Sequence, residues 1–404
     1  MRILIINLFL IVLCFSCKKE ELKISSVELN GPDEIIEIGE YSSSAINGAT
    51  YEWTISEDFY ILEGQGTWKI KVKPKKSFAA GELCVKIKTK DDEKKICKPI
   101  RFNQFLIRSM SINIPGRRCG ILYCLNNMLY FGMGTADLYL TQNIPASFSK
   151  FYKMSSNFDS ANPILIGNGP LNLKRSSPVY FTNANKAYLG FGTDANSNSY
   201  SDFWEFDPVN QIWTQLASNI NLPAEATTNF VINTKAYIIG GRNLSGAKKT
   251  NCIYDFQTNN WSTGAPIPTA IGKYDANSFS DGTFGYILGG TDAVNIHSDF
   301  YKYDPQTDSW TTLNNYPGYS RRAGLLFKVG NNVYYGGGYD SIGGLTDFWK
   351  LDLTNGNWTN LPTLPFSIQN AAFCSANNSG YFFGGIIYSN FSYNLISDVY
   401  EIKF

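Results

Sequence analysis

Charged side chains recur at one spacing in the C-terminal three quarters of the chain, and their types suit the binding of an acidic ligand. Each stands sixteen or seventeen residues before the second member of a glycine pair. The charged positions are Arg118, Arg175, Glu225, Lys273 and Arg322, and Gln369 holds the sixth. Guanidinium groups bind carboxylates through two parallel hydrogen bonds, so we expect a site for an anionic or hydroxyl-rich ligand.

Aromatic side chains accompany these residues in a long loop near the C-terminus. Tyr388, Phe391 and Tyr393 lie within residues 386–397. Their rings could stack on sugar faces, so we count them as candidate ligand-binding residues. A structural explanation of the basic residues stays equally open, because the same cations could simply bond loop carbonyls and Glu225 around the rim of a channel.

Composition excludes several functional classes. His297 is the single histidine, which rules out multi-histidine zinc or copper sites and leaves little room for a Ser-His-Asp triad. The net charge of +1 gives no electrostatic footprint for nucleic acid. We therefore expect no metal, no cofactor and no nucleic-acid partner.

The elements that position these residues are repeats. The second glycines are Gly134, Gly192, Gly241, Gly290, Gly338 and Gly385, separated by 58, 49, 49, 48 and 47 residues. Several copies continue with an Asp-aromatic step, such as Asp299-Phe300-Tyr301 or Asp347-Phe348-Trp349, then a turn and a tryptophan. A period near fifty with this pattern indicates a repeat architecture built from strands.

The pattern resembles that of kelch repeats, in which each repeat is a four-stranded blade of a β-propeller. The resemblance implies an all-β fold with a six-bladed propeller over residues 105–404. The sixth copy ends one strand short, and an orphan strand lies before the first copy. We expect residues 105–115 to supply the outer strand that closes the last blade. The glycines and tryptophans are then scaffold.

Strand parity in such a blade predicts one functional face. The start of the first strand and the loop between the second and third strands emerge on the same side. The charged positions, His297 and the expanded loop of residues 386–397 therefore share a rim. We expect a binding module for glycan or protein at this face.

Enzymes within the kelch family supply the alternative. The copper-dependent galactose oxidases are disfavoured by the single histidine. A mutarotase or epimerase acting on an acidic sugar needs only an acid, a base and a carboxylate clamp. Glu225 and Arg322 are the candidate catalytic pair for that alternative.

The first twenty-three residues resemble a bacterial lipoprotein leader. An apolar run, residues 3–15, is too short to span a bilayer. Cys17 stands two residues after this run, and Lys18 and Lys19 follow it. The resemblance implies a signal peptide over 1–16, acylation of Cys17 and a tether over 17–23. We expect an outer-membrane, lipid-anchored protein on the cell surface. A periplasmic orientation and a plainly secreted protein remain alternatives.

Residues 24–104 alternate apolar residues with lysine, which predicts a small β-sandwich with a solvated face. Tyr51-Glu52-Trp53 and the glycines near residue 65 resemble PKD-like, immunoglobulin-type domains. Cys84 and Cys97 flank a turn at nearly equal distances, so a cross-strand disulfide is expected in an oxidising compartment. The remaining cysteines, Cys119, Cys124, Cys252 and Cys374, are expected to be buried thiols.

Overall fold

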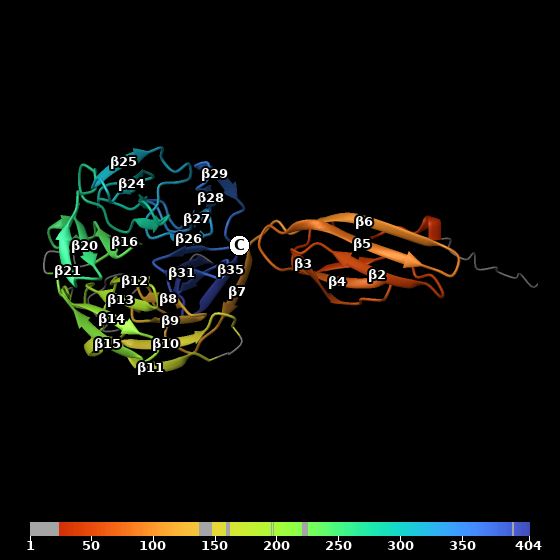
Figure 1. Ribbon diagram of the computed structural model, residues 1–404, viewed down its shortest axis with the longest axis horizontal. Helices are drawn as coiled ribbons and strands as arrows, with labels where there is room; N and C mark the ends of the chain where they lie inside the picture. The colour runs from red at the N-terminus through yellow and green to blue at the C-terminus, as the bar shows by residue number, and fades with distance from the viewer. Residues whose placement is uncertain are drawn as a thin grey trace, which may run out of the picture. The chain divides into compact units, whose positions relative to one another are not determined.

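The computed structural model describes residues 24–136, 148–158, 162–194, 196, 198–219, 225–389 and 392–404. These form two compact units (Figure 1): the described residues up to Lys75 with Ala79–Asn103, and Lys76–Phe78 with Gln104–Phe404. Apart from two short 3-10 turns, Ile24–Ser26 and Pro170–Asn172, the described secondary structure is β. The all-β prediction is confirmed. Within the described residues no helix has the length and apolarity to cross a membrane.

The N-terminal unit consists of two three-stranded antiparallel sheets. One has the order β1-β4-β3 (Gly39–Ser42, Lys69–Pro74, Phe59–Glu63), and the other β2-β5-β6 (Thr50–Ile55, Ala80–Lys88, Glu93–Arg101). In β4 the residues Ile70 and Val72 are buried while the lysines between them face outward. This alternation is the physical basis of the sandwich, since one face of each strand packs in the core.

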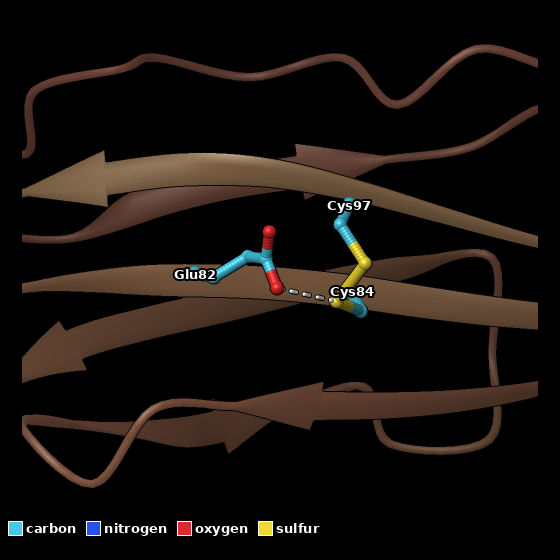
Figure 2. A group of neighbouring side chains, drawn as sticks. All are labelled: Glu82, Cys84 and Cys97. Carbon is cyan, nitrogen blue, oxygen red and sulfur yellow. Dashed lines mark hydrogen bonds between the residues drawn. A yellow bond between two sulfur atoms is a disulfide. The ribbon is translucent and has the colours of Figure 1, made fainter.

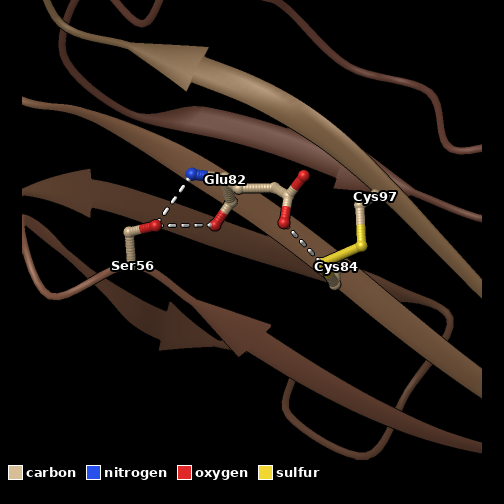
Figure 3. The surroundings of a disulfide bond; sticks show 4 residues. All are labelled: Ser56, Glu82, Cys84 and Cys97. Atoms are coloured by element: carbon tan, nitrogen blue, oxygen red, sulfur yellow. Dashed lines mark hydrogen bonds between the residues drawn. A yellow bond between two sulfur atoms is a disulfide. The ribbon is translucent and has the colours of Figure 1, made fainter.

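A disulfide joins Cys84 of β5 to Cys97 of β6, the pair expected from the sequence (Figure 3). The two residues are directly opposite in the strand register, with Cα atoms 4.0 Å apart. The covalent link therefore fixes the pairing of the two longest strands of the unit.

The second unit contains six four-stranded antiparallel sheets, the blades of a propeller (Figure 1). From the innermost strand outward, blade 1 consists of β8 to β11 (Ile121–Leu125, Met128–Gly132, Lys150–Ser155, Ile164–Asn168). Blade 2 consists of β12 to β15 (Val179–Asn183, Lys186–Gly190, Phe203–Asp207, Ile212–Leu216). Blade 3 consists of β16, β17, β20 and β21 (Thr228–Ile232, Lys235–Ile239, Asn251–Asp255, Asn260–Thr263). Blades 4 and 5 are β22 to β25 (Asn277–Ser280, Gly285–Leu288, Phe300–Asp304, Ser309–Leu313) and β26 to β29 (Leu325–Val329, Asn332–Gly336, Phe348–Asp352, Asn357–Leu361).

Blade 6 is assembled from both ends of the unit. Its strands are β31 (Ala372–Ala376), β32 (Ser379–Phe383), β35 (Val399–Lys403) and β7 (Leu106–Met110). β7 pairs with β35, so the strand that precedes blade 1 in sequence is the outermost strand of blade 6. An ion pair between Arg108 and the buried carboxylate of Glu401 lies across this pairing. The ring is therefore closed by hydrogen bonds between distant parts of the chain.

A second disulfide reinforces that closure and corrects the expectation of free thiols. Cys124 of β8 is bonded to Cys374 of β31, 250 residues away. The bond links the innermost strands of blades 1 and 6. Cys119 and Cys252 are free, and burial raises the pKa of the Cys252 thiol to about 11.

The second glycines join neighbouring blades. The amide of Gly338 donates to the carbonyl of Ile368 in blade 6 at 2.7 Å, and Gly290 donates to Arg321 of blade 5 at 2.8 Å. Gly338 has φ +73°, and a Cβ there would lie 2.5 Å from the carbonyl oxygen of Arg322. Only glycine allows this approach, which fixes the rim residue Arg322 in place.

The late tryptophans complete the contacts between blades. Trp261 donates its indole N–H to Ala217 of the preceding blade at 2.7 Å, and Trp310 does the same to Ala265 at 2.9 Å. Trp261 also packs edge-on against Phe203 of blade 2, with ring centroids 5.2 Å apart. Their role is structural.

Candidate ligand-binding site

The first strands of all six blades start at a narrow neck around the central axis. Fifteen residues before each second glycine the backbone adopts left-handed φ values of 50° to 55°. These neck residues are Cys119, Ser177, Ala226, Asp275, Ala323 and Asn370. Amides of the neck bond carbonyls of the neighbouring blade: Asp275 to Ala226, Ala323 to Asp275, Asn370 to Ala323, Cys119 to Asn370 and Ser177 to Cys119. The neck is therefore a hydrogen-bonded, preorganised ring.

The residue immediately before the neck faces a funnel above it. Arg118, Arg322 and Gln369, sixteen residues before their second glycines, line a cavity of about 600 Å³. Tyr339, Asp340, Ile342, Ile386 and Tyr393 belong to the same wall. The structure thus brings together two of the predicted arginines, the predicted glutamine and one of the predicted aromatic rings.

Arg175 and Lys273 occur one residue earlier in the repeat, and this shift removes them from the funnel. Both side chains are buried and paired with the aspartate of the Asp-aromatic step in their own blade. Arg175 donates to both oxygens of Asp202 at 3.0 and 2.7 Å, and Lys273 pairs with Asp299. The prediction that all five charged residues share one rim is therefore wrong for these two.

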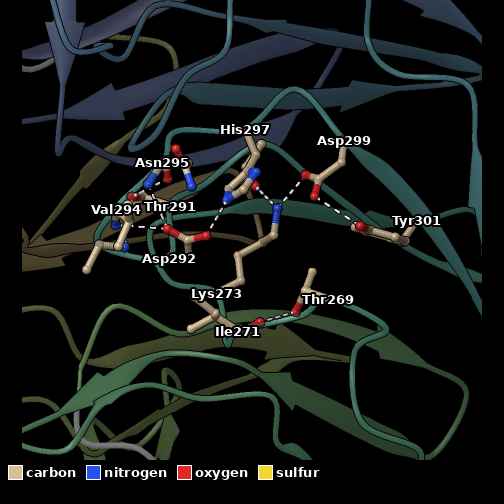
Figure 4. A network of polar contacts seen from close by, with 12 residues as sticks. Thr269, Ile271, Lys273, Thr291, Asp292, Val294, Asn295, His297, Asp299 and Tyr301 are labelled. Carbon is tan, nitrogen blue, oxygen red and sulfur yellow. Dashed lines mark hydrogen bonds and ion pairs between the residues drawn. The ribbon is translucent and has the colours of Figure 1, made fainter.

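Lys273 illustrates the structural role (Figure 4). Its ammonium group donates to the carbonyl of Gly289 at 2.7 Å and to Asp299, whose other oxygen accepts from Tyr301 at 3.0 Å. Burial lowers the pKa of Lys273, and Asp299 opposes that effect. An ammonium group so fully bonded has little capacity left for a ligand.

His297 lies beside this network and also has an internal partner. Its Nε2 atom is 3.1 Å from a carboxylate oxygen of Asp292 (Figure 4). Burial alone would raise the pKa of Asp292, but the amides of Asn295 and Val294 and the imidazole of His297 lower it. The histidine therefore stabilises the loop to which it belongs, through its contact with Asp292.

Glu225 stands at the position equivalent to Arg118 and Arg322, yet it is held away from the cavity. Arg242 donates to one of its oxygens at 2.8 Å, and Thr193 donates to the other at 3.1 Å. Glu225 is not among the described residues that line the funnel cavity. The predicted catalytic pair of Glu225 with Arg322 is therefore not assembled around one cavity.

A different carboxylate stands next to Arg322. Asp275 of the neck approaches the Nη1 atom of Arg322 at 3.9 Å. Burial raises the pKa of Asp275, while Arg322, Arg242 and Arg118 oppose the shift and Glu225 adds to it. Because three cations surround two carboxylates and burial raises the pKa of one of them, the floor of the funnel is electropositive.

Tyr339 extends the same cluster upward. The Arg322 guanidinium lies 4.4 Å from the centre of its ring. Burial, helped by Asp275, raises the pKa of Tyr339 to about 12, so the phenol stays protonated and can donate a hydrogen bond. Sequence reasoning missed Asp275, Arg242 and Tyr339. The signal was available for the last two, because each directly follows a second glycine.

The expanded loop of blade 6 forms a hairpin beside the funnel. β33 (Ile386–Ser389) pairs with β30 (Ser367–Gln369) and with β34 (Ser392–Leu395). The rings of Tyr388 and Tyr393 lie 4.8 Å apart. Tyr393 lines the cavity and Tyr388 does not, while Phe391, like Cys17, lies outside the described residues. The described part of the hairpin therefore forms part of the funnel wall.

Below the neck the central channel is chemically different. A cavity of about 440 Å³ there has no Lys, Arg or His among its described lining residues, and the Cys124–Cys374 disulfide forms part of its wall. Tyr180 of blade 2 accepts a hydrogen bond from the amide of Phe373 in blade 6 at 3.0 Å. This contact spans the channel, so we place the candidate site in the funnel.

Among the described residues, one group in the N-terminal unit has clustered metal-ligand atoms, and it is unsuited to metal binding. Glu82, Cys84 and Cys97 come within 4.8 Å of one another (Figure 2). The two sulfur atoms are bonded to each other, so neither is a thiolate.

Comparisons with known proteins agree with this architecture. The family model described as the KLHDC2/KLHL20/DRC7 Kelch-repeats domain matches residues 121–327, which is 207 of the 404 residues. A model of a PKD-like domain matches residues 38–95. Among solved structures, one titled "Structure of YjhT" is similar with a TM-score of 0.59 and 16% identity, covering 71% of this chain and 95% of that one. Among the curated proteins, none matches the chain. The protein belongs to the kelch-repeat family and carries a PKD-like domain before its propeller.

Proposed function

We propose that the protein is a lipid-anchored binding module that holds an acidic, hydroxyl-rich ligand, such as an acidic sugar of a glycan, in the funnel of its propeller. The observation that carries this proposal is the pair of guanidinium groups, Arg118 and Arg322, in the wall of one cavity. Two guanidinium groups that line the same cavity suit a carboxylate ligand better than a neutral one.

The size and lining of the funnel support a ligand of sugar size. A volume of about 600 Å³ falls in the range of small-molecule sites, roughly 300–1,000 Å³. Gln369, Ser341 and the phenols of Tyr339 and Tyr393 supply polar atoms around the arginines. Aromatic rings beside hydrogen-bonding groups suit the two faces of a sugar, one apolar and one hydroxylated.

Preorganisation of the neck supports binding as the main activity. The backbone ring beneath the funnel and the glycine contact to Arg322 fix the rim before any ligand arrives. Fixed donors lose little conformational entropy on binding, so a small ligand can be held by few contacts.

The direct test is isothermal titration calorimetry, in which the purified chain is titrated with glucuronate and with N-acetylneuraminate and the affinity is measured. Arg118→Ala with Arg322→Ala should lower affinity by at least tenfold, in line with loss of charge-assisted hydrogen bonds worth about 1.5–3 kcal/mol each. Lys302→Ala with Lys350→Ala is the matched control, since it removes two cations from third strands. Equal affinity of both double variants for every acid that binds would refute the proposal.

Asp275 favours a second candidate, a mutarotase or epimerase acting on an acidic sugar. Asp275 lines the cavity below the neck and not the funnel, but it lies 3.9 Å from Arg322, which does line the funnel. A carboxyl with a raised pKa in this place is a candidate proton donor or acceptor. NMR exchange spectroscopy of the anomers of N-acetylneuraminate measures the reaction directly. Acceleration that disappears in Asp275→Asn supports this candidate, and exchange at the uncatalysed rate rejects it.

A further inference from the structure

Three consecutive blades carry loops of the same length on the funnel face. In blades 3, 4 and 5 the loop between the second and third strands closes with a bond to the second glycine. Lys248 donates to Gly241, His297 to Gly290 and Leu345 to Gly338, each at 2.9 Å and each across seven residues. Because the blades are related by rotation about the central axis, loops of the same length at equivalent positions should extend equally far from the face of the propeller.

Each loop presents one large apolar side chain at its tip. Leu244 is 98% exposed, Val294 79% and Ile342 95%. Most exposed apolar residues in proteins are scattered and need no explanation. Val294 and Ile342 stand four residues after their second glycines and Leu244 stands three after its own, all near the tips of equally long loops in adjacent blades. We therefore treat them as one feature and call them the apolar tips.

The tips are held rigidly. Asp292 accepts from the amides of Val294 and Asn295 at 2.8 and 2.7 Å, and Asp340 accepts from Ile342 and Gly343 at 2.7 and 2.9 Å. Asn243 makes the corresponding bond to Ser245 at 2.9 Å. These side-chain turns keep the apolar residue outward without help from a partner.

The rest of this face has the composition of a surface that meets lipid head groups. Leu171 and Tyr319 lie in connections between blades on the same side and are 69% and 65% exposed. Exposed lysines follow two of the apolar residues in the chain, Lys174 three residues after Leu171 and Lys249 five residues after Leu244. The carboxylates of Asp292 and Asp340 are turned inward onto their own loops. Apolar tips with lysine beside them and tyrosine at the border are typical of interfacial membrane binding.

We propose that the apolar tips dock the propeller on an anionic lipid bilayer, with an acidic head group reaching Arg118 and Arg322 in the recessed funnel. The docking by the tips stands on the loops alone. The head-group contact rests on the proposed function, because it uses the same two arginines. The lipid that presents the acid would then be the source of the funnel ligand.

The separation of the tips favours a bilayer over a protein surface. Leu244 lies between Asn243 and Ser245, and Ile342 lies between Ser341 and Gly343, so these two tips have polar or small chain neighbours. Protein interfaces bury a contiguous apolar core. A fluid lipid surface receives separate side chains one by one, each contributing in proportion to the area it inserts.

Flotation with lipid vesicles tests the proposal. The full chain carries Cys17→Ser throughout, so that no acyl group contributes. Vesicles contain equal amounts of phosphatidylglycerol and phosphatidylcholine. Leu244→Ser with Val294→Ser and Ile342→Ser should lower the vesicle partition coefficient roughly tenfold or more, because three aliphatic side chains no longer leave water. The control is Val209→Ser with Ile212→Ser, two exposed apolar residues in the turn after the third strand of blade 2 and at the start of its fourth strand. It should change partition less than twofold.

Vesicles of phosphatidylcholine alone separate the two halves of the proposal. Arg118→Ala with Arg322→Ala should remove the preference for anionic vesicles while partition that depends on the tips persists. Equal flotation of the parent and the triple variant would overturn docking by the tips. If flotation is equal but acidic sugars still bind in an arginine-dependent way, the proposed function stands and the lipid surface is excluded. If the tips matter and the arginines do not, the head-group contact is overturned.

Discussion

Arg321 and Arg322 are consecutive in the chain, yet their guanidinium groups lie in opposite environments. Arg321 is fully buried and paired with Asp347 inside blade 5, and it donates to the carbonyl of Gly337. Arg322 lines the funnel cavity 3.9 Å from Asp275. The alternation of an extended chain sends one cation to the scaffold and the next to the ligand.

This contrast predicts opposite outcomes for two neighbouring substitutions. Arg321→Ala leaves the buried carboxylate of Asp347 without its cation, which costs about 3–5 kcal/mol. In a unit of this size that loss lowers Tm by roughly 5–10 °C. Arg322→Ala should change Tm by less than about 2 °C, because Arg322 borders a cavity. Thermal melts of the two variants under identical conditions measure the difference. Equal losses of Tm would contradict the assignment of Arg322 to the funnel.

The repeats made the fold predictable from the sequence. The second glycine has a local structural role that recurs in all six blades, and the Asp-aromatic step and the tryptophans recur in several of them, so their spacing indicates six blades. The buried partners of Arg175 and Lys273 recur as well, since Asp202 and Asp299 belong to the same repeated step. These ion pairs were predictable from the sequence, because the basic residue and its aspartate partner both belong to the same repeat.

The site was predictable only in part. Arg175 and Lys273 precede their second glycines by seventeen residues and Arg118 and Arg322 by sixteen. A shift of one residue reverses the direction of a side chain. Asp275 reaches Arg322 from the neighbouring blade, and Cys124 meets Cys374 across 250 residues. Contacts between blades follow from the closure of the ring and leave no trace in local spacing.

Membrane attachment through Cys17 gives a cellular prediction. In the proposed function, acylation of that cysteine would anchor the chain, and a serine or alanine side chain cannot carry the lipid. Cys17→Ala should therefore shift the protein from the membrane fraction to the soluble fraction after mild salt washing. Cys119→Ala, which alters a free cysteine of the propeller, is the matched control and should leave fractionation unchanged. Detergent-sensitive retention of Cys17→Ala that persists when Leu244, Val294 and Ile342 are also changed to serine would contradict an acyl anchor.

The buried carboxyl at the neck predicts a pH-dependent stability. Because the folded pKa of Asp275 is raised, the folded state holds this proton more tightly than the unfolded chain does. The stabilisation is complete below the unfolded pKa, near 3.8, and is lost as pH rises through the folded value. Asp275→Asn keeps a residue that tolerates the left-handed backbone and cannot ionise. Its stability relative to the parent should therefore rise with pH above about 4.

Denaturant titrations of both proteins at a series of pH values between acid and neutral check this prediction. The difference in unfolding free energy should grow in favour of Asp275→Asn as pH rises. A difference that moves the other way would mean that Arg322, Arg242 and Arg118 outweigh burial and lower the pKa of Asp275.

The disulfide between Cys124 and Cys374 should be the main covalent support of the ring. It restricts the unfolded chain over 250 residues, and links of this kind typically contribute about 2–4 kcal/mol. Cys124→Ala with Cys374→Ala should thus lower the Tm of the propeller by roughly 5–10 °C. Cys84→Ala with Cys97→Ala is the matched control, because that disulfide lies within the N-terminal unit. Its loss should leave the propeller transition in place. If calorimetry shows the same propeller Tm with and without the Cys124–Cys374 bond, then the β7–β35 pairing alone is sufficient to hold blades 1 and 6 together.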